Sequence, residues 1–165
     1  MSGKGLTMSY TVMAMSEIYA QKIIKWKYKG ILSIYNFKEN DETINELLTK
    51  EYYVVLDTKA KIVGYFCTGE SAIVPKGKKF GVYDDTSFVD IGIGLSPRLI
   101  GKGKGYPFFM FCLDYIRKMN NNRFRLTVLD FNKRAIHIYH KAGFIIDNYF
   151  KSDNEKYYLV MILLD

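Results

Sequence analysis

The feature that most constrains this chain is an apolar strand that runs into a glycine-rich turn and then into an apolar helix. The stretch runs from Asp90 to Gly105, and the helix is expected over Tyr106–Met119. Glycines and cations alternate in the turn: Arg98, Gly101, Lys102, Gly103, Lys104 and Gly105. Bare glycines let backbone N–H groups close around an anion, and a helix N-terminus adds partial positive charge. The segment therefore predicts a pyrophosphate site and a nucleotide-bearing cofactor.

Three phosphate-binding patterns compete for these residues. The P-loop pattern fails because Lys104 is followed by Gly105 and not by Ser or Thr. The dinucleotide fingerprint fails because its third glycine position holds Tyr106. The pattern [R/Q]-x-x-G-x-[G/A] fits without adjustment, with Arg98, Gly101 and Gly103 at its fixed positions.

This last pattern resembles the acyl-CoA-binding motif of the GCN5-related N-acetyltransferase (GNAT) superfamily. A second motif of that superfamily, N-x-x-A-x-x-x-Y-x-x-x-G-F, is matched downstream by Asn132, Ala135, Tyr139, Gly143 and Phe144. The two motifs occur in the superfamily's order and together cover about residues 90–150. The first half of the chain matches mainly in the order of its elements.

The resemblance implies an α/β (α+β) fold in which residues 1–165 form a single acyl-CoA N-acyltransferase domain, with disorder over residues 1–8 left open. It also implies a central mixed, mostly antiparallel sheet of about seven strands with about four flanking helices. Two strands are expected to splay at the cofactor site.

Hydrophobic periodicity and turn residues predict the individual elements. Strands are expected at Tyr10–Met15, Tyr52–Leu56, Ile62–Thr68, Phe88–Leu95, Phe124–Leu129, Phe144–Phe150 and Tyr157–Leu164. Helices are expected after Ser16, over Asp41–Thr49, over Tyr106–Met119 and from near Asn132, with Asp130 as the cap of the last. Residues 30–40 and 69–86 are expected to be connections. Pro107 requires that its helix start near Lys104 or have an irregular first turn.

The resemblance also assigns roles in acetyl transfer from acetyl-CoA to a primary amine by direct attack, without an acyl-enzyme or a metal. The cofactor contacts it implies are Ile93, Leu95, Arg98, Leu99, Ile100, Gly101, Lys102, Gly103, Lys104, Gly105, Asn132, Ala135 and Tyr139. Backbone N–H groups of Ile93 and Leu95 are expected to form the oxyanion hole. Asn132 is expected to contact the pantetheine arm of coenzyme A or its amide groups.

Tyr139 is the expected general acid for the coenzyme A thiolate, since a phenol with a pKa of ~10 can donate to a thiolate held against it. Packing of Tyr139 on the sheet is the alternative. Asp90 and Glu70 are the candidates for the general base, and an ordinary surface carboxylate is the alternative for both.

Four aromatic residues near the first helix, Trp26, Tyr28, Tyr35 and Phe37, are the candidates for acceptor binding. An aromatic face can hold a cationic amine, although such residues also build cores. Few acids accompany them beyond Glu39 and Asp41, which disfavours a polycationic acceptor. A small amine, an amino-acid derivative and a protein N-terminus all remain open.

The cations behind the net charge of +7 are dispersed along the chain, so nucleic-acid binding is not expected. The cations near Gly101–Gly105, with Lys133, Arg134 and Lys141, are expected to form a basic rim that steers coenzyme A. Cys67 and Cys112 are expected to be reduced core thiols of a cytoplasmic protein. His137 and His140 lack the further ligands of a metal site. No membrane segment is expected, and either a monomer or a homodimer is expected. A catalytically silent acyl-CoA sensor or scaffold is the alternative function.

Overall fold

The computed structural model describes residues 9–119 and 123–164, so the expectation for residues 1–8 lies outside the described part. The strands are β1 (Thr11–Ala14), β2 (Tyr52–Leu56), β3 (Ile62–Thr68), β4 (Phe88–Leu95), β5 (Arg123–Leu129), β6 (Ile145–Lys151) and β7 (Tyr157–Leu163). The α-helices are α1 (Glu17–Ile23), α2 (Asp41–Thr49), α3 (Pro75–Lys78), α4 (Gly105–Met119) and α5 (Lys133–Lys141). Short 3-10 helices are η2 (Gly30–Tyr35), η3 (Gly69–Ala72) and η4 (Pro97–Leu99).

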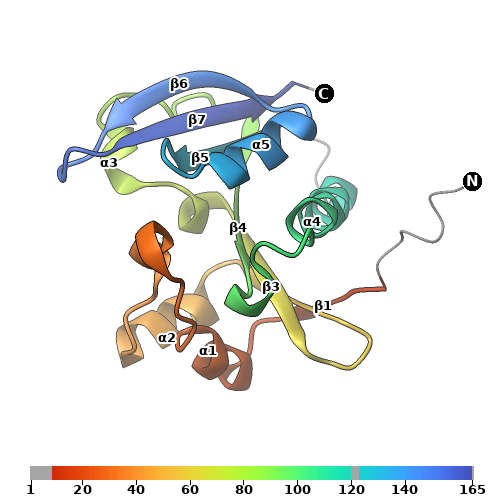
Figure 1. Cartoon of the computed structure of the whole chain (residues 1–165). Helices are drawn as coiled ribbons and strands as arrows, with labels where there is room; N and C mark the ends of the chain where they lie inside the picture. The colour runs from red at the N-terminus through yellow and green to blue at the C-terminus, as the bar shows by residue number, and fades with distance from the viewer. Residues whose placement is uncertain (1–8, 120–122, 165) are drawn as a thin grey trace, which may run out of the picture. The chain divides into compact units, whose positions relative to one another are not determined.

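The seven strands form one mixed sheet in the order β1-β2-β3-β4-β5-β7-β6 (Figure 1). β1 pairs with β2, and β7 pairs with both β5 and β6, all antiparallel. β4 and β5 are parallel, and their register covers only Phe88–Asp90 with Arg123–Arg125. The predicted sheet and its seven strands are therefore confirmed.

Residue contacts divide the chain into two units. Unit 1 holds the described residues up to Phe66 together with Ile93–Tyr115, and unit 2 holds Cys67–Gly92 together with the described residues from Ile116 onward. In unit 1 the fully buried side chains include Ile23, Leu47, Val54, Val55, Phe66 and Phe108. In unit 2 they include Ile116, Phe124, Leu129, Phe144, Val160 and Met161.

Local polar residues fix several of the element ends. Ser16 caps α1 by accepting from Tyr19 N at 3.4 Å, and Asn40 caps α2 by accepting from Thr43 N at 2.8 Å. Each cap satisfies an N–H group that the helix itself leaves without a partner. The β2–β3 turn is held by Asp57, whose Oδ1 accepts from the backbone N–H groups at 59 and 61.

The structure differs from the predicted elements over residues 30–40, which contain η2, over residues 69–86 and at the cap of α5. Residues 69–86, expected as a loop, contain η3 and the short α3. The cap of α5 is Asn132, not Asp130, because Asn132 Oδ1 accepts from Ala135 N at 3.3 Å. In agreement with the expectation from Pro107, the helix after the turn starts next to Lys104, at Gly105, so Pro107 lies in its first turn, where no intrahelical N–H is needed.

Neither cysteine forms a disulfide and both are buried, as predicted. Cys67 in β3 is 3% exposed and Cys112 in α4 is 1% exposed. Burial raises the pKa of the Cys112 thiol, which keeps it protonated and unreactive.

Candidate functional site

The glycine-rich turn has the open, left-handed backbone that a phosphate cradle requires. Gly101 and Gly103 have φ values of +77° and +73°, a region that side chains with a Cβ rarely adopt. A Cβ built on Gly103 would meet no atom within 4 Å, so the surface of the turn is open at this residue. The N-terminus of the 15-residue α4 follows at Gly105. Helix N–H groups and glycine backbone thus lie together, as an anion site demands.

Three cations surround this turn. Arg98, Lys102 and Lys104 are all exposed, whereas the spacers Leu99 and Ile100 are half-buried. Arg98 Nη2 donates to the carbonyl of Ile62 at 3.0 Å, which fixes the guanidinium against the start of β3. A guanidinium has five N–H donors, so this one bond leaves Arg98 able to bind an anion as well.

Two tyrosines contact the strand that leads into the turn. A Cβ on Gly94 would lie 2.3 Å from the Tyr65 ring, so only glycine lets that ring rest on the backbone of β4. The Tyr28 hydroxyl donates to the carbonyl of Leu95 at 2.6 Å. Burial raises the pKa of Tyr28, so this hydroxyl remains a donor at all relevant pH values. Ile93 and Leu95, the predicted oxyanion residues, are half-buried.

Two of the four predicted acceptor residues converge on Tyr65. Its ring centroid lies 6.0 Å from Trp26 and 5.8 Å from Phe37, and Tyr52 completes the group at 5.9 Å. We call these four residues the aromatic cluster. Tyr65 itself was not predicted, although the alternation of β3 places it on the same face as the buried Val63. Tyr35, by contrast, ends η2 and is 36% exposed.

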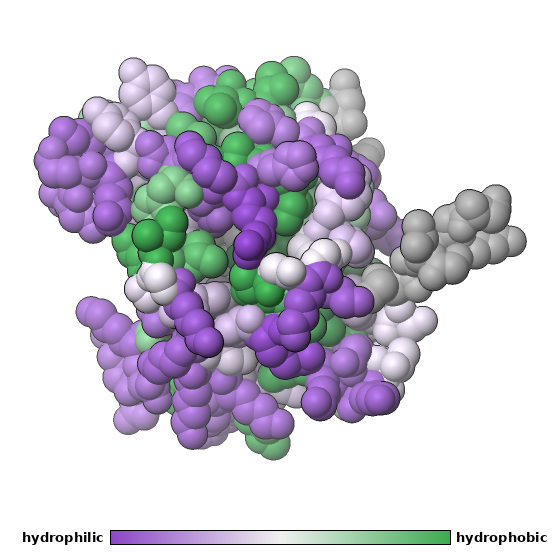
Figure 2. All heavy atoms as spheres, in the orientation of Figure 1, coloured by the Kyte–Doolittle hydropathy of each residue, from purple (hydrophilic) through white to green (hydrophobic). Residues whose placement is uncertain are grey.

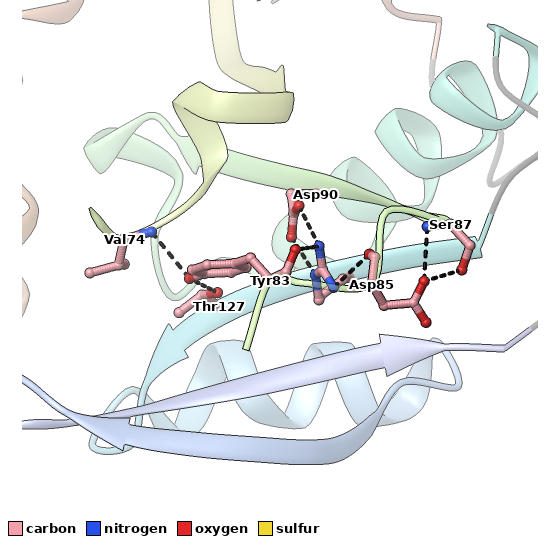
Figure 3. Close-up of polar contacts among 7 residues, drawn as sticks. Val74, Tyr83, Asp85, Ser87, Asp90 and Thr127 are labelled. Atoms are coloured by element: carbon pink, nitrogen blue, oxygen red, sulfur yellow. Dashed lines mark hydrogen bonds and ion pairs between the residues drawn. The ribbon is translucent and has the colours of Figure 1, made fainter. Parts of the chain in front are cut away.

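Asp90, a predicted base, belongs to a buried ion-pair network (Figure 3). Its two carboxylate oxygens accept from Nε and Nη2 of Arg125 at 2.7 and 2.8 Å. Arg125 is 3% exposed, donates to the carbonyls of Asp85 and Tyr83, and lies 5.3 Å from the Tyr83 ring. The hydrogen bonds that Arg125 donates to Asp90 raise the pKa of Arg125. The Asp90 carboxylate therefore neutralises a buried guanidinium.

Tyr83 extends this network toward β5. Its hydroxyl accepts from Val74 N at 3.1 Å and lies 2.7 Å from the Thr127 hydroxyl. Burial raises the pKa of Tyr83. The segment before β4 is thus tied to β5 through polar side chains, a contact that no local sequence pattern signals.

Glu70, the other predicted base, lies in η3 on the surface of unit 2. Its Oε1 is 2.9 Å from Lys78 Nζ, and its side chain is 73% exposed. An exposed pair of this kind contributes little to stability, so the carboxylate can exchange its partner at small cost.

The second motif forms α5 and its two ends. Asn132 caps the helix, as described above, by accepting a hydrogen bond from the backbone N–H of Ala135. Tyr139 is half-buried, with its ring centroid 6.4 Å from that of Phe144. Gly143 has a φ of +104° and ends the helix, and a Cβ there would lie 3.2 Å from Leu163. The residues at both ends of this motif therefore have a structural role at the two ends of the helix.

The predicted residues fall into the two units. The turn, Ile93, Leu95 and the aromatic residues belong to unit 1, whereas Glu70, Asp90, Asn132, Ala135 and Tyr139 belong to unit 2. Over residues 9–119 and 123–164, no group of three or more His, Cys, Asp or Glu side chains could hold a metal ion. In the same residues, no helix is long and apolar enough to cross a membrane.

Comparison with known proteins gives consistent results. The profile of the acetyltransferase (GNAT) family matches residues 20–144. A comparison with curated protein sequences found no match. Among solved structures, a chimera of the spermidine N-acetyltransferase SpeG from Vibrio cholerae and hSSAT has a TM-score of 0.66 at 19% identity, covering 94% of this chain and 95% of its own.

Two further solved structures have the same fold. A GNAT-family acetyltransferase from Bacillus anthracis has a TM-score of 0.71 at 16% identity and covers 94% of both chains. A candidate phosphinothricin N-acetyltransferase has a TM-score of 0.70 at 15% identity, covering 95% of this chain and 99% of its own. At these identities the likeness concerns the fold.

Proposed function

The chain belongs to the acetyltransferase (GNAT) family, and we propose that it transfers an acetyl group from acetyl-CoA to a primary amine by direct attack. The observation that carries this proposal is the turn between β4 and α4. Gly101 and Gly103 there adopt left-handed backbone beside a helix N-terminus and three exposed cations. This combination suits a pyrophosphate bound largely by backbone N–H groups.

In this proposal the acyl group lies along β4, and N–H groups of Ile93 and Leu95 donate to the carbonyl oxygen as it becomes negative. The fixed position of β4 supports this role. Tyr65 supports the backbone at Gly94, and Tyr28 binds the carbonyl of Leu95. Donors that are held before the substrate arrives need no reorganisation during the reaction, which is the condition for strong stabilisation of an oxyanion.

We assign proton donation to the departing thiolate to Tyr139. Asn132 and Gly143 fix the two ends of α5, which gives Tyr139 a defined place on the helix. For the general base we favour Glu70 or a water molecule over Asp90. The reason is that Asp90 already neutralises the buried Arg125, and protonating it would leave that cation uncompensated.

The acceptor is proposed to be an amine that carries a single positive charge. The aromatic cluster can hold one ammonium group or an apolar substituent. A polyamine needs several carboxylates, and in unit 1 Glu39 is already paired with Lys27 at 2.7 Å. Lys22 and Lys25 lie in the same part of the chain as Trp26 and would repel further cations. The spermidine activity in the name of a similar structure is therefore not transferred to this chain.

An acceptor screen tests the proposal. Purified protein is incubated with acetyl-CoA and a panel of monoamines, amino acids, peptides with free N-termini, and spermidine, and free thiol release is followed. We expect turnover with at least one singly charged amine and little with spermidine. Tight acetyl-CoA binding without turnover on any member of the panel would favour the alternative of a silent acyl-CoA sensor or scaffold.

A further inference from the structure

A basic pocket lies in unit 1 beside the residues that lead into the glycine-rich turn. Its volume is about 510 Å³. Its walls come from the end of α1 and the residues after it, from the β2–β3 turn, and from Ser96–Arg98. Five cations line it, namely Lys22, Lys25, Lys27, Lys61 and Arg98. We call this the lysine pocket.

No carboxylate is among the described residues that line the lysine pocket. Two acids near these cations, Glu39 and Asp57, already have partners. Glu39 pairs with Lys27 at 2.7 Å, and Asp57 accepts two backbone N–H groups of its own turn. These backbone hydrogen bonds, with the charges of Arg98 and Lys61, lower the pKa of Asp57. The positive field of the pocket is therefore only partly compensated by the protein, and a concave arrangement concentrates such a field.

The framework of the pocket is rigid even though its lysines are exposed. Ile23 and Ile24 are 0% and 4% exposed, which anchors the end of α1, where Lys22 lies, and the residues directly after it, which include Lys25. Ser96 N donates to the carbonyl of Val63 at 2.8 Å. Arg98 is held on the carbonyl of Ile62. The positions from which the cations project are thus set by the fold.

Aromatic surface is also present in the lysine pocket. Tyr19 and Trp26 both line it, and each offers a flat face on which a planar organic group can stack. Figure 2 shows hydrophilic side chains gathered over α1 and α2 on the face in view, in keeping with a site for a charged and soluble ligand. A ligand that uses both the cations and the aromatic faces is an organic anion.

We propose that the lysine pocket binds a phosphate monoester, distinct from the pyrophosphate expected on the glycine backbone. A dianion matches a pocket that is lined by lysines from α1 and the residues after it and by Lys61 of the β2–β3 turn, since each lysine can approach the phosphate as a point charge. Either of two molecules can supply this phosphate. It is the ribose phosphate of coenzyme A, a reading that rests on the proposed use of acetyl-CoA, or it belongs to a separate phosphorylated molecule.

The test uses Trp26, which is the only tryptophan of the chain and lines the pocket. Its fluorescence is followed during titration with acetyl-CoA, with 3′-dephospho-acetyl-CoA, and with adenosine 3′,5′-bisphosphate in the presence of saturating acetyl-CoA. The pocket variant is Lys25→Gln/Lys61→Gln, which removes one cation from each of two walls. The matched control is Lys29→Gln/Lys50→Gln, which changes the same net charge at two exposed lysines outside the pocket.

We expect the pocket variant to lose about three- to tenfold in affinity for the phosphate-bearing probe, beyond any change in the control. If the source is coenzyme A, the loss appears with acetyl-CoA and is absent with the 3′-dephospho form. If the source is a separate molecule, the bisphosphate binds wild-type protein already saturated with acetyl-CoA, and the pocket variant weakens that binding. Equal affinities of the pocket and control variants for all three probes would overturn the proposal. Failure of acetyl-CoA itself to bind wild type would instead refute the proposed function.

Discussion

Asp90 and Arg125 allow a structural role to be separated from a catalytic one. The carboxylate and the guanidinium form a two-bond pair, and their side chains are 12% and 4% exposed. Replacing Asp90 by Asn removes the charge that compensates a nearly buried cation. Breaking a buried pair from one side typically costs about 3–5 kcal/mol. For a chain of this length that corresponds to a fall in Tm of roughly 6–20 °C.

Thermal unfolding of three variants tests this reasoning. Asp90→Asn should show the full loss of stability. The double variant Asp90→Leu/Arg125→Met should recover most of it, because replacing both charges with apolar groups of similar size is often close to neutral. The recovery will be incomplete because the carbonyls of Asp85 and Tyr83 lose a donor. Glu155→Gln, which breaks the exposed pair with Lys151, is the control and should leave Tm nearly unchanged.

Two outcomes would contradict this assignment. A Tm for Asp90→Asn within about a degree of wild type would mean that the pair contributes almost nothing to the fold. A double variant that is stable and binds acetyl-CoA normally, but turns over about a hundredfold more slowly, would make Asp90 the base.

The remaining predictions concern the proposed chemistry. Gly103→Val should lower acetyl-CoA affinity more than tenfold, because a branched side chain would occupy the open surface of the turn. Gly30→Val is the matched control: its φ is +62° and its Cβ position is equally empty, so calorimetry should show the same strain of about 1–2 kcal/mol without the loss of binding. Equal losses of affinity in both variants would refute the placement. Tyr139→Phe should reduce turnover by ~10²–10⁴-fold with acetyl-CoA affinity nearly intact, and a change within about twofold would assign the proton to another group or to solvent. Glu70→Gln should leave Tm unchanged, and it should shift the pH–rate profile if Glu70 is the base. An unaltered profile would leave water in that role.

Short-range patterns were sufficient for most elements of this fold. The predicted bounds of α2, β2, β3 and β4 agree with the structure because turn and capping residues stand at their ends. The helices within residues 69–86 are not predicted by the sequence, and the reason is physical. Four residues cannot show helical periodicity, and a helix as short as α3 forms only through tertiary packing.

The packing that forms α3 is visible around Val82. This residue is buried with Phe150 and Val160, and Val74 and Tyr83 pack against the same group. Gly77 lies so close to Phe150 that a Cβ would approach the ring to 2.9 Å. Contacts between residues about seventy positions apart, and not local propensity, therefore order this part of the chain.

The sequence predicts the part of the candidate site that depends on the backbone conformation of the turn. It does not predict the part that depends on ion pairs between side chains far apart in the chain. Left-handed glycines in the turn follow from the spacing of glycine between a strand and a helix. The ion pair of Asp90 with Arg125 does not, since the two residues are 35 positions apart. The parallel register nevertheless places them directly opposite each other, so a correct alignment of β4 on β5 would have revealed the pair.

The support of β4 explains why aromatic residues gather in unit 1. The flat ring of Tyr65 can lie on the backbone only because Gly94 has no side chain. Trp26, Phe37 and Tyr52 then confine that ring, and Tyr28 holds the next carbonyl of the strand. The same residues thus fix the strand proposed to bind the acyl group and form the surface proposed to receive the amine. Changes in the aromatic cluster should therefore alter the rate of transfer as well as acceptor affinity, because both depend on the position of β4.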